Sequence, residues 1–561
     1  MQYGFVKTAA LTPSIRVADC AYNARQIIEV LRGAAAAGAE IACLPELCIT
    51  GYTCGDLFFQ PVLQQGARDA LADVLRDTAG LPLLFVLGLP LTHGGKLYNC
   101  AAVCQNGRVL GVVPKTHLPN YNEFYEKRQF TPAPAENGVI DLSGAQVPFG
   151  TNLLFQCGTQ PALTLAVEIC EDLWAPLPPS TRHAMAGATL ICNLSASDET
   201  IGKAEYRRAL VTGQSARLLC GYVYADAGEG ESTTDMVFAG HNMVAENGAL
   251  LAETAPFCGG MALTDIDVER LAGERLKNTS FPAEDSANYE VIPFVLPQNV
   301  SPLTRIVSSA PFVPADAEQR ARRCDAILAM QASGLKKRLE HTHAKTAVVG
   351  ISGGLDSCLA LLVTVRAFSL LERPLSDIVA VTMPCFGTTE RTRTNAQRLC
   401  EALGVTLQHV DITQTVRSNF ADIGQDEARH DVTYENTQAR VRTLVLMNLA
   451  NRLGGLVIGT GDLSELALGW ATYNGDHMSM YGVNASVPKT LIRHIVASVA
   501  DETESSALRQ VLRDILDTPV SPELLPAENG KISQQTEEIV GPYTLHDFFL
   551  YHFIQNGYSP A

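Results

Sequence analysis

Residues 346–357, which read TAVVGISGGLDS, decide the fold of the C-terminal half of this 561-residue chain. A run of β-branched and apolar residues stops at Gly353 and Gly354, and residues 358–368 then form an apolar stretch of helical length. This pattern predicts a strand, a tight turn and a helix. Backbone N–H groups at a helix N-terminus attract anions, and glycine lets an anion come close to the backbone. We therefore expect a phosphate site at this turn.

The polar residues of the turn narrow the kind of phosphate site. Ser352 and Ser357 add hydroxyl groups, and Asp356 can bind the divalent cation that accompanies a nucleoside triphosphate. The turn has no lysine, so it is not a Walker loop. A glycine pair alone would indicate only a tight turn, and the polar residues around it make the pattern more specific. It resembles the loop of ATP pyrophosphatases, which holds the β,γ-pyrophosphate as a leaving group. The resemblance implies ATP binding by Gly350, Ile351, Ser352, Gly353, Gly354, Leu355, Asp356 and Ser357.

The composition limits the classes of protein to which the chain can belong. Its length predicts two domains, and 47% hydrophobic with 18% charged residues is typical of a globular protein. A net charge of −17 argues against broad binding of nucleic acids or anionic membranes. The 15 cysteines include no Cys-x-x-Cys pair, and we find no secretory signal or membrane-spanning segment. We expect a soluble, cytoplasmic protein.

Three predicted strands of the N-terminal half each lead to one reactive side chain. The predicted strand at 40–44 leads to Glu46, the strand at 108–113 leads to Lys115, and the strand at 163–169 leads to Cys170. In layered α/β folds the loops at strand ends converge, so these groups can meet. A thiol nucleophile needs a base, which the carboxylate supplies, and a cation stabilises the oxyanion formed on attack at an amide. Taken singly, these residues would be surface charges and a core cysteine.

Three motifs of this half resemble the nitrilase superfamily: LPEL at 44–47, PKTHLP at 114–119 and EICED at 168–172. The resemblance implies an αββα sandwich that cleaves a carbon–nitrogen bond through a thioester. It makes Cys170 the nucleophile, Glu46 the general base and Lys115 the charge stabiliser. In members that hydrolyse glutamine, the positions around the substrate correspond here to Tyr121, Glu171, Ser197 and Lys203. Packing, a turn or surface charge would also explain these four residues.

The second half alternates strands with helices. We predict helices at 317–339 and 389–403 and strands at 378–383 and 456–458, which indicates a doubly wound parallel, Rossmann-like sheet. Residues 293–314 are rich in proline, serine and valine. We therefore predict a first domain at 1–290, a linker at 291–316 and a second domain at 317–561.

Further motifs of the second half resemble NAD synthetases: ENTQAR at 435–440, GTGDLSE at 459–465 and PKT at 488–490. With the nitrilase-like half in front, the chain resembles the glutamine-dependent members of that family. The resemblance assigns Thr460 and Lys489 to ATP, Asn436, Glu465 and Asp476 to the dinucleotide deamido-NAD, and Asp356 and Glu465 to Mg²⁺. Helix caps and surface charge are the alternative explanations of these residues.

The resemblance also implies a reaction in two steps and a homo-oligomer. Glutamine is hydrolysed to glutamate and ammonia; ATP adenylates deamido-NAD with release of pyrophosphate, and ammonia then displaces AMP to give NAD. Family members continue beyond residues 541–543 with a basic stretch, whereas this chain ends at Ala561. An alternative is therefore an amidase whose second domain binds nucleotide without turnover. Another is a pyrophosphatase-loop amidotransferase that makes a different amide.

Overall fold

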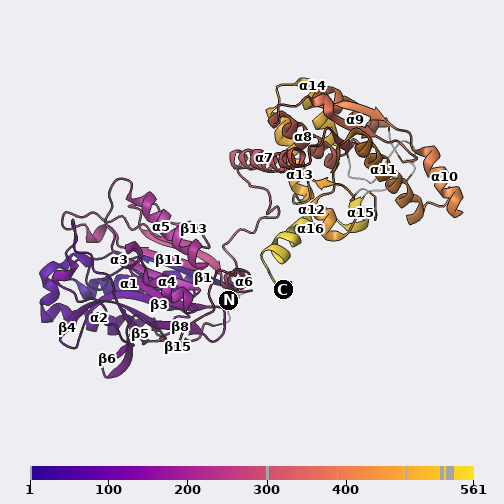
Figure 1. Cartoon of the computed structure of the whole chain (residues 1–561). Helices are drawn as coiled ribbons and strands as arrows, with labels where there is room; N and C mark the ends of the chain where they lie inside the picture. The colour runs from indigo at the N-terminus through magenta and orange to yellow at the C-terminus, as the bar shows by residue number, and fades with distance from the viewer. Residues whose placement is uncertain are drawn as a thin grey trace. The chain divides into compact units, whose positions relative to one another are not determined.

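A computed structural model describes residues 3–297, 302–387, 390–475, 477–518, 524–525 and 536–560 of the chain (Figure 1). The chain forms two compact units. Unit 1 comprises Met1–Ile306 with Asn556–Ala561, and unit 2 comprises Val307–Gln555. No described helix combines the length and the apolar character that crossing a membrane requires.

Unit 1 is built on two β-sheets. The first has the order β14-β1-β2-β3-β4-β5-β7-β6 and the second the order β13-β12-β11-β10-β9-β8-β15. The strands of the first sheet are β1 (Phe5–Thr12), β2 (Ile41–Cys43), β3 (Leu84–His93), β4 (Lys96–Gln105), β5 (Arg108–Pro114), β6 (Gly138–Leu142), β7 (Ala145–Phe149) and β14 (Gly260–Asp267). Those of the second are β8 (Leu153–Cys157), β9 (Thr164–Ile169), β10 (Leu190–Ser195), β11 (Gly221–Asp226), β12 (Met243–Glu246), β13 (Ala249–Glu253) and β15 (Glu290–Phe294).

Three apolar cores hold these layers together. One core joins the facing sides of the two sheets and includes Val86 and Val167. A second packs helices on the outer face of the first sheet, and a third does so on the second sheet. The helices of unit 1 are α1 (Cys20–Ala36), α2 (Pro61–Thr78), α3 (Glu171–Trp174), α4 (Pro179–Met185), α5 (Lys203–Leu218) and α6 (Val268–Lys277). The predicted αββα sandwich is confirmed.

The strand ends place the reactive side chains as the sequence predicts. A hairpin turn at Asn106 and Gly107, both with positive φ, joins β4 to β5, and β5 ends next to Lys115. The turn that carries Glu46 packs closely on β3. A Cβ atom at Gly88 would lie 2.2 Å from the Leu47 nitrogen, so only glycine permits this approach.

The predicted linker begins inside a strand. β15 pairs in parallel with β8, because its apolar residues complete the edge of the second sheet, where Pro293 is tolerated. Beyond β15, Asp265 Oδ2 accepts hydrogen bonds of 2.6 Å from both the N–H and the hydroxyl of Thr304. The segment before Ile306 therefore belongs to unit 1.

Unit 2 contains a five-stranded parallel sheet with the order β18-β17-β16-β19-β20. Its strands are β16 (Ala347–Gly350), β17 (Ile378–Thr382), β18 (Thr406–His409), β19 (Leu456–Gly459) and β20 (Tyr481–Gly482). Its helices are α7 (Ala317–Thr342), α8 (Leu355–Leu370), α9 (Glu390–Leu403), α10 (Thr413–Ile423), α11 (Val432–Leu453), α12 (Leu463–Leu468), α13 (Lys489–Glu502), α14 (Ser506–Leu516), α15 (Thr536–Val540) and α16 (Tyr543–Phe549).

Helices cover both faces of this sheet, as predicted for a doubly wound fold. One core involves α7, α8, α9, α13 and α14, and the other involves α10 and α11. From β16 the chain first adds β17 and β18 on one side and then returns to add β19 on the other. The strand order therefore reverses between β16 and β19. A doubly wound sheet binds its ligands at the carboxyl ends of the strands at such a point.

Candidate active sites

A buried ammonium group bridges two carboxylates at the centre of unit 1. Lys115 Nζ lies 2.6 Å from Glu46 Oε1 and 2.7 Å from Glu126 Oε1. The side chains of Lys115 and Glu46 are fully buried. Burial alone would lower the pKa of Lys115, but the two carboxylates raise that pKa well above its usual value. Lys115 is therefore a fixed positive charge.

Cys170 lies beside this charged group. It follows β9 directly and precedes α3 with a φ of 44°, an uncommon conformation for a residue with a side chain. Its thiol pKa is raised well above the usual value, first by burial and then by Glu46, while Lys115 lowers it. The thiol is therefore neutral at rest and needs a base before it can attack a substrate. The structure thus brings the predicted residues Glu46, Lys115 and Cys170 together.

Of the four residues predicted to bind glutamine, Glu171 follows Cys170 directly in the sequence. The Tyr121 hydroxyl donates a 2.8 Å hydrogen bond to Glu171 Oε1. Burial raises the pKa of Glu171, whereas Tyr121, Lys115 and Lys203 lower it. Lys203 bonds to the carboxylate of Asp198 and lies over the rings of Phe124 and Trp174.

Ser197 is almost completely buried and is held from two sides. Its N–H donates to Asp226 Oδ1 at 2.9 Å, and its Oγ accepts from Arg207 Nη2 at 3.2 Å. Together, Glu171, Lys203 and Ser197 supply an anionic, a cationic and a hydroxyl group.

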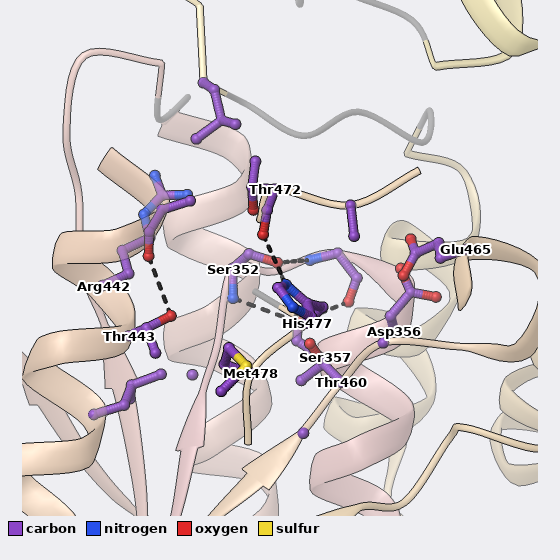
Figure 2. Close-up of a pocket in the computed structure, with 18 of the residues that line it drawn as sticks. Ser352, Asp356, Ser357, Arg442, Thr443, Thr460, Glu465, Thr472, His477 and Met478 are labelled. Atoms are coloured by element: carbon purple, nitrogen blue, oxygen red, sulfur yellow. Dashed lines mark hydrogen bonds between the residues drawn. The ribbon is translucent and has the colours of Figure 1, made fainter. Parts of the chain in front are cut away.

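Unit 2 contains a cavity of about 490 Å³ at the predicted phosphate turn (Figure 2). The predicted residues that line it are Gly350, Ile351, Ser352, Gly354, Leu355, Asp356, Ser357, Asn436, Thr460 and Glu465. Gly353 instead shapes the turn: its φ is 86°, and a Cβ atom there would lie 2.1 Å from the Thr392 carbonyl oxygen.

The two serines of the turn brace it. Their hydroxyl oxygens lie 3.2 Å apart, and Ser352 Oγ accepts the Gly354 N–H at 3.1 Å. Both hydroxyls therefore have partners inside the turn, which the sequence did not predict.

Three carboxylates converge on one buried ammonium at the edge of this cavity. Lys489 Nζ lies 2.8 Å from Asp356 Oδ2, 2.7 Å from Asp462 Oδ2 and 2.8 Å from Glu465 Oε1. Burial and then the charge of Asp356 raise the pKa of Glu465 to about 8. Lys489, predicted to bind ATP, thus pairs with carboxylates here and does not line the cavity.

This acidic cluster fits a divalent cation. One oxygen from each of Asp356, Asp462 and Glu465 lies within 4.8 Å of the others. Asp356 Oδ1 is buried and accepts no hydrogen bond from the described residues. Carboxylate oxygens are the ligands that Mg²⁺ prefers. Lys489 supplies one positive charge to three carboxyl groups, so a bound cation would neutralise the remaining negative charge.

Comparisons with known proteins agree with this division of the chain. A family model described as carbon-nitrogen hydrolase matches residues 7–275, and one described as NAD synthase matches residues 327–560. The chain is 45% identical over its whole length to the glutamine-dependent NAD(+) synthetases of Mycobacterium tuberculosis and Mycobacterium bovis, and it covers 85% of each. It belongs to the glutamine-dependent NAD(+) synthetases.

More distant relatives carry the same name. The protein of Thermotoga maritima is 28% identical, with 99% of this chain and 89% of the relative aligned. A solved structure of the synthetase of Acinetobacter baumannii is 24% identical and covers 91% of this chain and 84% of that one, with a TM-score of 0.41. Glutamine-dependent NAD(+) synthetases are ligases that form NAD, and both of the expected domains are present here.

Several groups in the two sites of this synthetase were not predicted. Glu126 was missed because it lies in a short 3₁₀ helix, Glu126–Arg128, whose other residues are exposed. Asn99 is the fourth residue of β4, which is buried except for Lys96, and Asp462 lies inside the GTGDLSE motif. Asn484 donates to the backbone oxygens of Asp356 and Thr460, at 3.0 and 3.1 Å. Only tertiary contacts distinguish these residues from ordinary polar positions.

Asp476, which was predicted to bind deamido-NAD, lies outside the described residues. Its neighbour His477 lines the cavity and shares a 2.8 Å hydrogen bond with the Thr472 carbonyl oxygen (Figure 2). The imidazole Nδ1 is therefore the donor, since a carbonyl only accepts.

Proposed function

We propose that unit 1 releases ammonia from L-glutamine and that unit 2 uses ATP to adenylate and then amidate deamido-NAD. The products are NAD, glutamate, AMP and pyrophosphate. The observation that carries the proposal is the buried group of Lys115 and two carboxylates beside the Cys170 thiol, in a chain that also contains a pyrophosphatase-type turn. The proposed domains are 1–306 and 307–555, which moves the predicted boundary into the segment after β15.

In unit 1, Glu46 takes the proton from Cys170, and the thiolate attacks the side-chain amide carbon of glutamine. Lys115 stabilises the negative charge that develops during attack. The proton passes from Glu46 to the leaving nitrogen, the carbon–nitrogen bond breaks, and ammonia departs. Water then attacks the thioester and frees glutamate and the thiol. A positioned general base of this kind contributes roughly 10²- to 10⁴-fold to the rate.

The α-amino and α-carboxylate groups of glutamine need partners of opposite charge. We assign Glu171, positioned by Tyr121, to the ammonium group, and Lys203 to the carboxylate. Ser197 Oγ adds a hydrogen bond to the substrate. The charge of Lys203 lowers the pKa of Glu171, which supports placing the two side chains around one small substrate.

In unit 2, the turn at 350–357 and Thr460 bind ATP, and Asn436, Glu465 and Asp476 bind deamido-NAD. The substrate carboxylate attacks the α-phosphorus of ATP, and pyrophosphate leaves. Ammonia then attacks the acyl carbon, and AMP leaves. Asp356 and Glu465, with Asp462 beside them, would hold Mg²⁺, which screens the repulsion between carboxylate and triphosphate. Lys489 keeps these carboxylates oriented.

A product assay tests the proposal. The full chain with glutamine, ATP, Mg²⁺ and deamido-NAD should yield NAD, AMP and pyrophosphate; ADP and phosphate would contradict the adenylation step. Cys170→Ala should abolish synthesis from glutamine while synthesis from ammonium chloride continues. Glutamine hydrolysis without NAD formation from either nitrogen source would instead favour the amidase alternative. Substitution of other acceptor acids for deamido-NAD tests the third possibility.

The predicted homo-oligomer and cytoplasmic location remain predictions. Light scattering on the purified chain measures its mass in solution, and fractionation of cells measures its location. A monomer at micromolar concentration would contradict the first prediction.

A further inference from the structure

The side chain of Asn99 touches both carboxylates of the glutamine site. Asn99 lies in β4 and is 1% exposed. Its Nδ2 lies 2.6 Å from Glu46 Oε1 and 3.5 Å from Glu126 Oε2. Its backbone oxygen also accepts the N–H of Lys115 at 2.8 Å. One asparagine therefore contacts the three charged residues around the thiol.

The orientation of the Asn99 amide is set by these contacts. A carboxylate accepts hydrogen bonds only, so the NH₂ group must face Glu46. Asn99 Oδ1 is then left buried without a hydrogen-bond partner among the described residues. An unpaired buried polar atom is costly. The hydrogen bond from Asn99 Nδ2 to Glu46 offsets this cost.

The donors to Glu46 are few. Lys115 Nζ and Asn99 Nδ2 share Oε1, and the Ala196 N–H donates to Oε2 at 3.0 Å. Asn99 is the neutral side-chain donor of this set, and Lys115 is divided between two carboxylates. A buried carboxylate remains ionised only while donors replace its lost water.

We propose that Asn99 is a positioning residue that holds the Glu46 carboxylate in place and aimed at Cys170. This inference rests on the proposed role of Glu46 as the general base. The charged or titratable groups facing Glu46 are Lys115, Glu126, Glu231, Cys170 and Tyr52. Of these, only Lys115 is positive, so the Glu46 carboxylate also depends on neutral donors, which are the backbone N–H of Ala196 and one side-chain donor. Asparagine provides that donor without adding charge.

The test uses Asn99→Leu, which keeps the approximate shape and removes the donor. We expect kcat for glutamine hydrolysis to fall by about 10- to 100-fold, as expected for loss of one hydrogen bond to a charged group. KM should change little, because Asn99 holds the base and not the substrate. The acid limb of kcat/KM against pH should move to higher pH, since the carboxylate of the general base then has one hydrogen-bond donor fewer. Synthesis from ammonium chloride should persist.

Matched variants separate the possible outcomes. Asn137→Leu removes another bridging asparagine, which bonds the backbone of Asn152, and should leave the acid limb in place. Calorimetry of the full chain shows whether the leucine variant folds. If it does not, Asn99→Ser replaces it in the test, because serine retains a hydrogen-bond donor in a smaller side chain. Asn99→Ser should then retain more activity than Asn99→Ala. A lower kcat with an unmoved acid limb in the folded leucine variant would overturn the inference. Glutamine use by Glu46→Gln at the wild-type rate would instead overturn the proposed function.

Discussion

The carboxylate of Asp172 accepts the backbone N–H of His117 at 2.8 Å. The same side chain accepts the N–H of Ile169 at 3.0 Å. Asp172 therefore joins the segment that follows Lys115 to the strand end that precedes Cys170. Its burial raises its pKa to about 7, although the bonds from Ile169 and His117 lower that pKa. The buried Asp172 carboxyl group thus fixes the backbone near Lys115 relative to the backbone near Cys170.

The first prediction concerns the pH dependence of this connection. A carboxyl group whose pKa rises from 3.8 to about 7 on folding binds more protons in the native state, so its contribution to stability falls as pH rises between these values. Asp172→Asn replaces one of the two accepting oxygens with an NH₂ group that faces a backbone donor, and it should destabilise unit 1 by roughly 1–3 kcal/mol. The difference from wild type should be larger at pH 5 than at pH 8. Thermal unfolding of the full chain at both pH values measures it, and a pH-independent difference would refute the argument.

A second prediction follows from the effect of Glu126 on the thiol. Burial raises the pKa of Glu126 to about 7, and its charge in turn raises the pKa of Cys170. In Glu126→Gln that charge is absent, so alkylation of Cys170 by iodoacetamide should begin at lower pH. Peptide mass spectrometry measures the reaction, with the exposed Cys258 as a reference in the same sample. An unchanged profile at Cys170 would show that Glu126 does not act on the thiol.

Local patterns were sufficient for the residues at strand ends and insufficient for their partners. Glu46, Lys115 and Cys170 each follow an apolar run, so periodicity marks their positions. Glu126 is placed by the Tyr52 hydroxyl, which donates to it at 2.8 Å across 74 positions of the sequence. No short window contains that contact.

The linker and Lys489 illustrate the same limit. β15 is a strand only because β8, far earlier in the chain, offers an open edge. Lys489 follows a proline at the start of α13, which suggests an exposed residue, yet three carboxylates from elsewhere in unit 2 surround it. Charge partners that are distant in sequence cannot be identified without coordinates.

The third prediction concerns Lys489→Met. Removal of the ammonium leaves Asp356, Asp462 and Glu465 close together without their shared partner, and loss of one member of a buried ion pair typically costs about 3–5 kcal/mol. NAD formation from either nitrogen source should fall by at least about 100-fold, which corresponds to 2.7 kcal/mol of the barrier. Glutamine hydrolysis in unit 1 should continue. Equal loss of glutamate release would mean that the substitution unfolds the whole chain.

The fourth prediction tests the turn that we propose binds the phosphates of ATP. Gly353→Ala adds a Cβ atom 2.1 Å from the Thr392 carbonyl oxygen at a φ of 86°, so the turn and the start of α9 must move apart. The KM for ATP should rise by about 10-fold or more, because a misplaced turn loses backbone donors to the phosphates. Gly404→Ala is the matched control, since Gly404 also has a positive φ, 69°, but its Cβ atom would meet no atom within 4 Å. If both variants raise the KM equally, backbone strain alone is responsible and the close approach to Thr392 does not set the shape of the site.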